Sequence, residues 1–195
     1  MENIIFLDID GVLNDNDIGG SFNEESVIVV KELIKMYNAK VVMITSLQGN
    51  GTANRRRYFQ QRCEQYGIYD VDFIDPNFRG SLYFDRSSFS IEIAPRLLGI
   101  IDYLKSNQVS NYVILDDDYH KAYKQICLNH YRTRTYVGLT HKDLSKIKLK
   151  PVNLNNFRGI NYEYRQLGEY ESVTNNLIKV LKKRYEMVSN KDVKR

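Results

Sequence analysis

Three short apolar runs constrain the fold of this chain more than any other feature of its sequence. They are Ile4–Leu7, Val41–Ile44 and Tyr112–Leu115, and each is followed by polar residues. Uninterrupted apolar runs of this length are typical of strands that are buried on both faces of a sheet. We therefore expect three central strands with polar side chains at their carboxyl ends.

Segments in which apolar residues recur at helical spacing separate these strands. The predicted helices are Glu24–Asn38, Asn54–Tyr66, Pro95–Leu104, Tyr119–Asn129 and Thr140–Lys148. Shorter strands are predicted at Tyr69–Ile74, Leu82–Phe84 and Tyr131–Val137. Strands that alternate with helices are typical of a parallel sheet with helices on both faces. The sequence thus predicts an α/β fold of the Rossmann-like, three-layer α/β/α type.

The length of 195 residues suits one domain. We expect residues 1–150 to form the sheet domain and residues 48–94 to include a small cap or flap. Residues 151–195 are predicted to be a helical C-terminal extension packed on the core, with a helix at Leu177–Met187 and a basic tail.

The net charge of +4 comes from this extension, which carries nine basic and five acidic side chains. A basic tail can bind nucleic-acid phosphates. The alternative is a solvated helix face with a frayed terminus.

Several classes of protein do not fit the sequence. No apolar run is long enough to span a membrane, and the first residues do not resemble a signal peptide. Cys63 and Cys127 lack the spacing of zinc ligands, as do the three histidines. Two isolated cysteines suit a reducing compartment, so we expect a cytoplasmic protein.

The strongest chemical signal lies directly after the first strand. Asp8 and Asp10 follow the buried run, and a buried pair of carboxylates is costly without a counter-charge. Gly11 gives the backbone the freedom to turn sharply there. Because ligands bind beyond the carboxyl ends of parallel strands, Asp116 and Asp117 after the third strand belong to the same crevice. Mg²⁺ prefers such oxygen ligands, so we expect a Mg²⁺ site.

These motifs resemble those of the haloacid dehalogenase-like (HAD) superfamily, which implies a HAD-like fold. The matching positions occur in the family's order: Asp8-Ile9-Asp10-Gly11-Val12, Thr45-Ser46, Arg96 and Asp116-Asp117-Asp118. Over residues 3–148 the chain is most similar to the HAD domains of Swiss Army Knife RNA repair proteins. That group tends to carry Ser-Ser-Trp-Arg after the second strand, where this chain has Thr45-Ser46-Leu47-Gln48.

The resemblance implies a role for each matching residue. Asp8 would attack phosphorus to give an aspartyl-phosphate. Asp10 would protonate the leaving oxygen, then activate water, and its backbone carbonyl would bind the metal. Thr45 or Ser46 would hold a phosphoryl oxygen, and Arg96 or Arg86 would neutralise the transferring group. The metal ligands would be Asp8, Asp10, Asp116 and Asp117, with Asp118 capping the following helix.

The residues expected to bind substrate are Ser46, Gly11, Arg55 and Arg56. The basic run Arg55–Arg57 lies in the predicted helix Asn54–Tyr66 with Tyr58, Phe59 and Tyr66, which could stack on a base. Alternatively, this helix has a solvated basic face and an apolar face that packs on the core. The predicted function is a Mg²⁺-dependent phosphohydrolase that cleaves a phosphomonoester, on a small molecule, a nucleotide or a polynucleotide end. The alternative is a non-catalytic binding or regulatory protein on a HAD-like fold.

Overall fold

The computed structural model describes residues 1–14, 21–44, 53–75, 77–83, 90–92, 94–118, 123–124 and 126–164. The chain divides into two compact units, Met1–Glu163 and Tyr164–Arg195. The described helices and strands belong to the first unit, apart from the last residue of the final strand. The predicted helix at Leu177–Met187, the basic tail and Arg86 lie outside the described residues.

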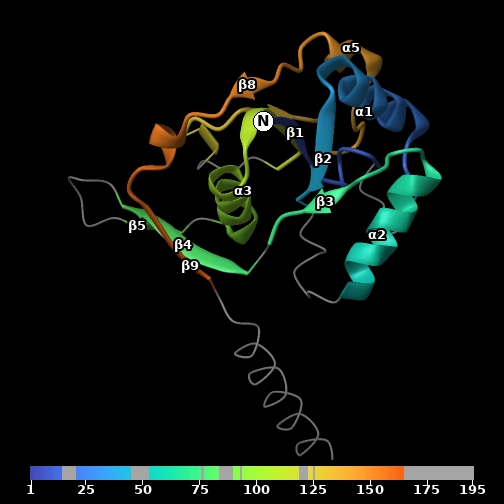
Figure 1. Cartoon of the computed structure of the whole chain (residues 1–195). Coiled ribbons are helices and arrows are strands. Elements are labelled where there is room, and N and C mark those ends of the chain that lie inside the picture. The colour runs from blue at the N-terminus through green and yellow to red at the C-terminus, as the bar shows by residue number, and fades with distance from the viewer. Residues whose placement is uncertain are drawn as a thin grey trace, which may run out of the picture. The chain divides into compact units, whose positions relative to one another are not determined.

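A mainly parallel sheet forms the centre of the first unit, with the strand order β3-β2-β1-β6-β7 (Figure 1). Its parallel strands are β1 (Glu2–Leu7), β2 (Ala39–Met43), β3 (Asp72–Phe73), β6 (Val109–Asp116) and β7 (His130–Arg132). A short strand, β8 (Lys150–Pro151), pairs with β6 in the antiparallel direction. Leu7 pairs with both Met43 and Leu115, so the three central strands end at the same level.

The two faces of the sheet bury separate clusters of side chains. Successive residues of each central strand alternate between them: Ile5 and Leu7 join one cluster, and Ile4 and Phe6 join the other. Helices α1 (Glu24–Tyr37) and α2 (Ala53–Gln65) contribute to the first cluster, and α3 (Pro95–Ser106) contributes to the second (Figure 1). The predicted three-layer α/β/α architecture is therefore confirmed.

Local signals in the sequence explain where the long helices begin and end. The Asn23 side chain accepts a hydrogen bond from the Ser26 amide and caps the start of α1. Asn38 ends that helix in the left-handed region, with φ of 46°, a conformation that Asn tolerates. Pro95 occupies the first turn of α3, as predicted.

A second, three-stranded sheet has the order β5-β4-β9. Strands β4 (Phe78–Tyr83) and β5 (Ser90–Glu92) form an antiparallel pair inside the predicted flap region, and β9 (Ile160–Tyr164) adds to β4. The sequence analysis did not predict β9. Phe157, in the 3₁₀-helix η2 (Leu154–Phe157), and Ile160 are buried in the same cluster as α3, so this part of the predicted extension packs on the core.

Three predicted elements are shorter than expected. The predicted strand Tyr69–Ile74 is only β3 (Asp72–Phe73). The predicted helix Thr140–Lys148 is only α5 (His141–Leu144). The amides of Lys146 and Ile147 both bond the Asp143 carbonyl in a closing turn, and the chain then pairs with β6 as β8. The predicted strand Tyr131–Val137 ends at Arg132, because the amides of Val137 and Gly138 bond the Arg134 carbonyl and form a turn.

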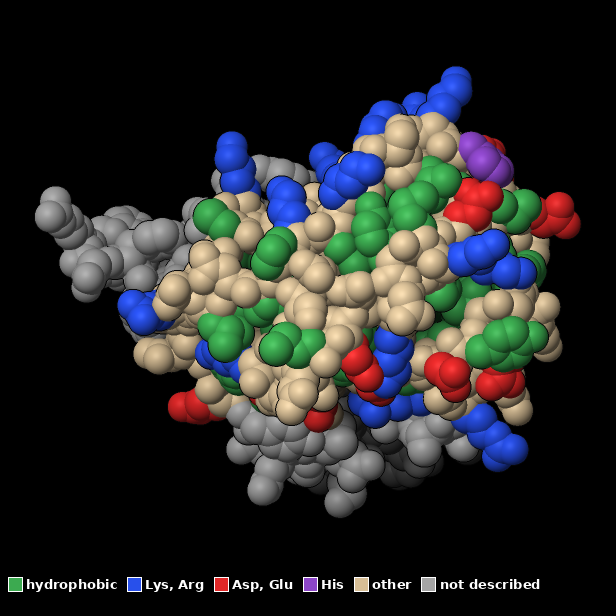
Figure 2. Space-filling view, turned by 45° about the horizontal axis from the view of Figure 1, so that its top comes forward, with side chains coloured by type: hydrophobic (Ala, Val, Ile, Leu, Met, Phe, Trp, Pro, Cys, Tyr) green, Lys and Arg blue, Asp and Glu red, His purple; other side chains and the backbone are tan. Residues whose placement is uncertain are grey.

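The described surface mixes charged, polar and single hydrophobic side chains. On the face that Figure 2 shows, Lys and Arg side chains gather along the upper part, and hydrophobic side chains lie in small groups among polar ones. None of the helices in the described ranges has the length and hydropathy needed to cross a bilayer.

Candidate active site

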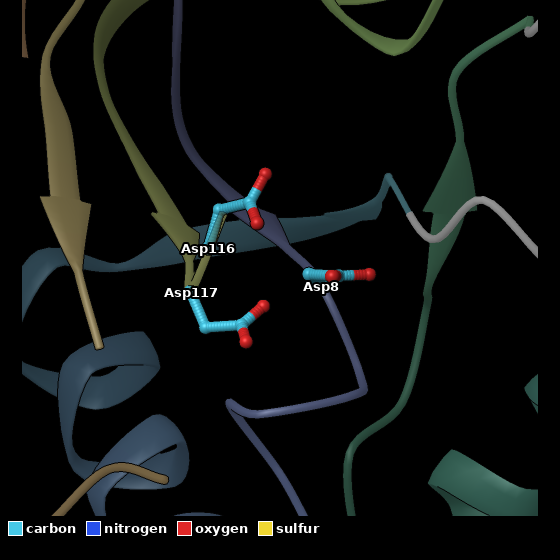
Figure 3. A group of neighbouring side chains, drawn as sticks. All are labelled: Asp8, Asp116 and Asp117. Atoms are coloured by element: carbon cyan, nitrogen blue, oxygen red, sulfur yellow. The ribbon is translucent and has the colours of Figure 1, made fainter. Parts of the chain in front are cut away.

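Three aspartates from two strand ends lie together at the carboxyl edge of the sheet. Asp8 follows β1, and its amide donates to the Leu115 carbonyl of β6 at 3.0 Å. One carboxylate oxygen from each of Asp8, Asp116 and Asp117 lies within 4.8 Å of the others. In Figure 3 the side chains of Asp116 and Asp117 extend from the end of β6 toward the side on which Asp8 lies. The parallel register of β1 and β6 thus produces the acidic cluster.

Arg96, at the start of α3, supplies positive charge to this cluster. Its Nη1 atom donates to Asp8 Oδ2 at 3.1 Å and to Asp116 Oδ2 at 2.8 Å. Burial alone would lower the pKa of Arg96, but the neighbouring carboxylates of Asp8 and Asp116 raise it above its usual value. The guanidinium therefore stays charged and bridges the two strand ends.

The positive charge of Arg96 offsets only part of the cost of burying the Asp8 carboxylate. Only 3% of Asp8 is exposed. Burial raises its pKa to about 7, Arg96 opposes this shift, and Asp116 adds to it. Its Oδ1 atom is buried and has no hydrogen-bond partner among the described residues. Buried polar atoms are rarely left without a partner, so Oδ1 marks a place for a cation or a donor from a ligand.

Asp116 is held by donors from the protein itself. Its Oδ2 atom accepts from Arg96 and from the Tyr123 hydroxyl at 2.7 Å, and its Oδ1 atom accepts from the Asp118 amide at 3.0 Å. Asp117 is less buried, and desolvation raises its pKa while a hydrogen bond from Thr135 lowers it. Asp117 therefore has more freedom than Asp116 to bind a ligand directly.

Tyr123 is a site residue that the sequence analysis missed. It is 2% exposed, its ring stacks on His130 at 4.3 Å between centroids, and burial raises its pKa well above the usual range. It therefore stays a hydrogen-bond donor to Asp116. With 15 tyrosines in the chain, no pattern distinguishes this one before its position in space is known.

Gly11 has a structural reason to be glycine at this place. Its φ is 70°, and a Cβ atom there would overlap the Asp117 carboxyl carbon and stand 2.8 Å from Asp117 Cβ. Its amide donates to Asn14 Oδ1 at 3.2 Å, and Asn14 Nδ2 donates to Asp10 Oδ1 at 3.1 Å. Asn14 therefore fixes both the turn and the Asp10 side chain, which lies outside the three-aspartate cluster.

The structure describes the remaining predicted site residues only in part. Thr45 and Ser46 directly follow Ile44 at the end of β2 but lie outside the described residues, as does the Arg55 side chain. Arg56 donates to the Ile74 carbonyl at 3.3 Å and lies 5.7 Å from the Phe73 ring centroid. These contacts tie Arg56 to β3 and to the segment that follows it.

Phe59 in α2 and Tyr66 directly after it have structural contacts. Phe59 is 6% exposed. The Tyr66 hydroxyl accepts from the Phe22 amide at 3.1 Å, and its ring packs on the Phe22 ring. Of the three aromatic residues, only Tyr58 is exposed, at 53%. Phe59 is therefore buried in the core and not available for the predicted stacking, while Tyr66 is partly buried against Phe22.

The fold and the acidic cluster define a HAD-type domain: the sheet has Asp8 after its first strand and the Asp116-Asp117 pair after β6. Residues 4–144 match the family model described as the HAD domain in Swiss Army Knife RNA repair proteins. The match covers well over half of the chain, so the chain belongs to this family. No curated protein and no solved structure gives a significant match. HAD domains are in general hydrolases, and the three-aspartate cluster is compatible with a phosphohydrolase.

Proposed function

We propose that this chain is a Mg²⁺-dependent phosphohydrolase that cleaves a phosphomonoester through an aspartyl-phosphate on Asp8. The observation that carries this proposal is the buried Asp8 carboxylate, which has one oxygen on Arg96 and the other without a partner among the described residues. A carboxylate held in this way is oriented by one oxygen and offers the other as a nucleophile or ligand.

The neighbouring residues have complementary roles in this proposal. Asp10 donates a proton to the leaving oxygen and then takes one from the attacking water, and Asn14 orients its carboxylate. Arg96 neutralises charge on the phosphoryl oxygens, while Asp116 holds Arg96 in place and Tyr123 holds Asp116. Thr45 or Ser46, which follow β2 in the sequence, would hydrogen-bond a phosphoryl oxygen.

The residues present fit a hard divalent cation. Three carboxylate groups have oxygens within 4.8 Å of one another, and Asp8 also has a buried oxygen without a partner among the described residues. Carboxylate oxygens are the donors that Mg²⁺ prefers. Asp8, Asp117 and the Asp10 backbone carbonyl would hold the ion, with Asp116 beside them. A bound Mg²⁺ would keep Asp8 ionised and offset the negative charge of the phosphoryl group.

For the substrate we propose a phosphorylated nucleotide or nucleic-acid end. The family is named for RNA repair proteins, and the basic tail in residues 177–195 adds positive charge for a polyanion. The free cysteines, Cys63 and Cys127, support a cytoplasmic location for this reaction.

The experiment is p-nitrophenyl phosphate hydrolysis by the wild type with Mg²⁺, compared with the Asp8→Asn variant. Asp70→Asn is the matched control, because Asp70 is an exposed aspartate in the left-handed region, which Asn also tolerates. We expect Asp8→Asn to abolish turnover and Asp70→Asn to keep it. If the wild type shows no turnover above Asp8→Asn with any of several divalent metals, the chain is a non-catalytic protein on a HAD fold.

A further inference from the structure

The turn that follows β7 lies directly against the acidic site. Thr133 Oγ1 donates to the Gly11 carbonyl at 2.7 Å. Arg132 Nε donates to the Asp117 carbonyl at 2.9 Å, and Thr135 hydrogen-bonds the Asp117 side chain. Residues 132–138 therefore contact two of the segments that form the site, and the site residues predicted from the sequence include none of them.

This turn is held at both ends. The amides of Val137 and Gly138 donate to the Arg134 carbonyl at 2.8 and 2.9 Å, and the Leu139 amide donates to the Val12 carbonyl at 3.1 Å. Gly138 has a φ of 69°, and a Cβ atom there would come within 2.8 Å of the Val12 carbonyl oxygen. Because Val12 directly follows Asp10 and Gly11 in the chain, the turn has a defined position relative to the catalytic aspartates.

The turn presents an unusual set of side chains to solvent. Six residues line an open hollow of about 500 Å³: Arg132, Thr133, Arg134, Thr135, Tyr136 and Val137. Both arginines are exposed, and Tyr136 is 81% exposed. A tyrosine ring that is so exposed contributes little to the core, yet its backbone is fixed by the hydrogen bonds of the turn. Such a ring can stack on a ligand at a small cost in entropy.

The segment that contains the turn is basic, which favours an anionic ligand. Between Asp118 and Asp143 the sequence has no acidic residue and five Lys and Arg residues. A planar guanidinium matches phosphate oxygens, and an exposed aromatic ring stacks on a base of any sequence. Val137 is the one other hydrophobic side chain of the hollow and is 42% exposed, so Tyr136 is the side chain of the turn that can stack on a base.

We propose that residues 132–138 bind the nucleotide next to the phosphate that the site removes. Arg132 and Arg134 would bind a backbone phosphate, and Tyr136 would stack on a base. This inference rests on the proposed phosphohydrolase function and names its substrate as a single-stranded polynucleotide end rather than a mononucleotide or a sugar phosphate. The predicted aromatic platform on α2 is the alternative surface, of which Tyr58 is the exposed member.

The test compares kcat and KM for a short single-stranded RNA with a 3′- or 5′-terminal phosphate against those for p-nitrophenyl phosphate. Stacking contributes about 1–3 kcal/mol per base. We therefore expect Tyr136→Ala to lower kcat/KM for the RNA by about tenfold relative to p-nitrophenyl phosphate, mainly through KM. Tyr136→Phe should keep most of the wild-type kcat/KM for the RNA. Tyr69→Ala is the matched control, because Tyr69 follows α2 and is 66% exposed. It should leave kcat/KM unchanged for both substrates.

Direct binding gives a second readout that does not require turnover. In fluorescence anisotropy with the same RNA, Arg134→Ala should reduce the slope of log affinity against log salt by about 0.7–1. Equal effects of Tyr136→Ala and Tyr69→Ala on the RNA would overturn the inference, as would a loss confined to Tyr58→Ala. The wild type could show no hydrolysis of any substrate while Tyr136→Ala still weakens RNA binding. In that case the proposed binding surface is supported and the phosphohydrolase proposal fails.

Discussion

Replacement of Asp8 by Asn should stabilise the metal-free protein at neutral pH. Burial raises the pKa of Asp8 from 3.8 to about 7, so the folded state binds this proton more tightly than the unfolded state. The stabilisation from the bound proton is complete below pH 3.8 and is lost as the pH rises through about 7. At about 1.4 kcal/mol per pKa unit, ionised Asp8 costs the folded protein about 4 kcal/mol. The neutral amide of the variant would carry no such cost, and Arg96 would keep its 2.8 Å contact with Asp116.

The assay is thermal unfolding in a chelating buffer between about pH 5 and pH 8, where about 3 kcal/mol of this cost should develop. For a chain of this length the Tm advantage of Asp8→Asn over the wild type should therefore grow by about 6–12 °C from the lower to the upper end of this pH range. Asp70→Asn, at an exposed aspartate, should show no such trend. Mg²⁺ should raise the Tm of the wild type more than that of Asp8→Asn. A Tm difference that does not change with pH, or an Asp8→Asn variant less stable than the wild type at pH of about 8, would refute the reasoning.

Substitutions at three further residues test the contacts around the aspartates. Arg96→Ala should lower kcat for p-nitrophenyl phosphate by about 10²–10³, and Arg96→Lys should recover part of it; full activity of Arg96→Ala in steady-state kinetics would exclude a role in the reaction. Gly11→Ala should remove the Mg²⁺-induced rise in Tm, because its Cβ displaces Asp117; calorimetry with the same rise as in the wild type would contradict this. Tyr123→Phe should lower the free energy of unfolding by about 1–3 kcal/mol in urea, since it removes a buried hydrogen bond to Asp116; no change would mean that Arg96 and the Asp118 amide suffice for that carboxylate.

The central part of the fold could be predicted from the sequence because local signals and burial agree there. The apolar runs of β1, β2 and β6 are strands, and their ends carry the expected polar residues. The sequence did not predict β9, since its residues pair with β4 through contacts far apart in the chain. The predicted helix at Thr140–Lys148 was too long, because tertiary pairing of β8 with β6 outweighs local helical spacing.

The acidic cluster could likewise be predicted, because the ends of parallel strands meet at one edge of the sheet. Arg96 was found as the cation at the start of the Pro95 helix, and it contacts Asp8 and Asp116. Tyr123 and the turn at residues 132–138 could not be found in this way. Their contacts with Asp116, Asp117 and Gly11 depend on how separate segments meet in space, and neither has a short motif.

The most direct measurement concerns the covalent step on Asp8. Wild-type protein with Mg²⁺ and a phosphomonoester is quenched in acid during turnover, and its peptides are examined by mass spectrometry. We predict one phosphoryl group on the peptide that contains Asp8, and none in the Asp8→Asn variant. Turnover without phosphoryl transfer to Asp8, or turnover that persists in Asp8→Asn, would contradict the proposed mechanism.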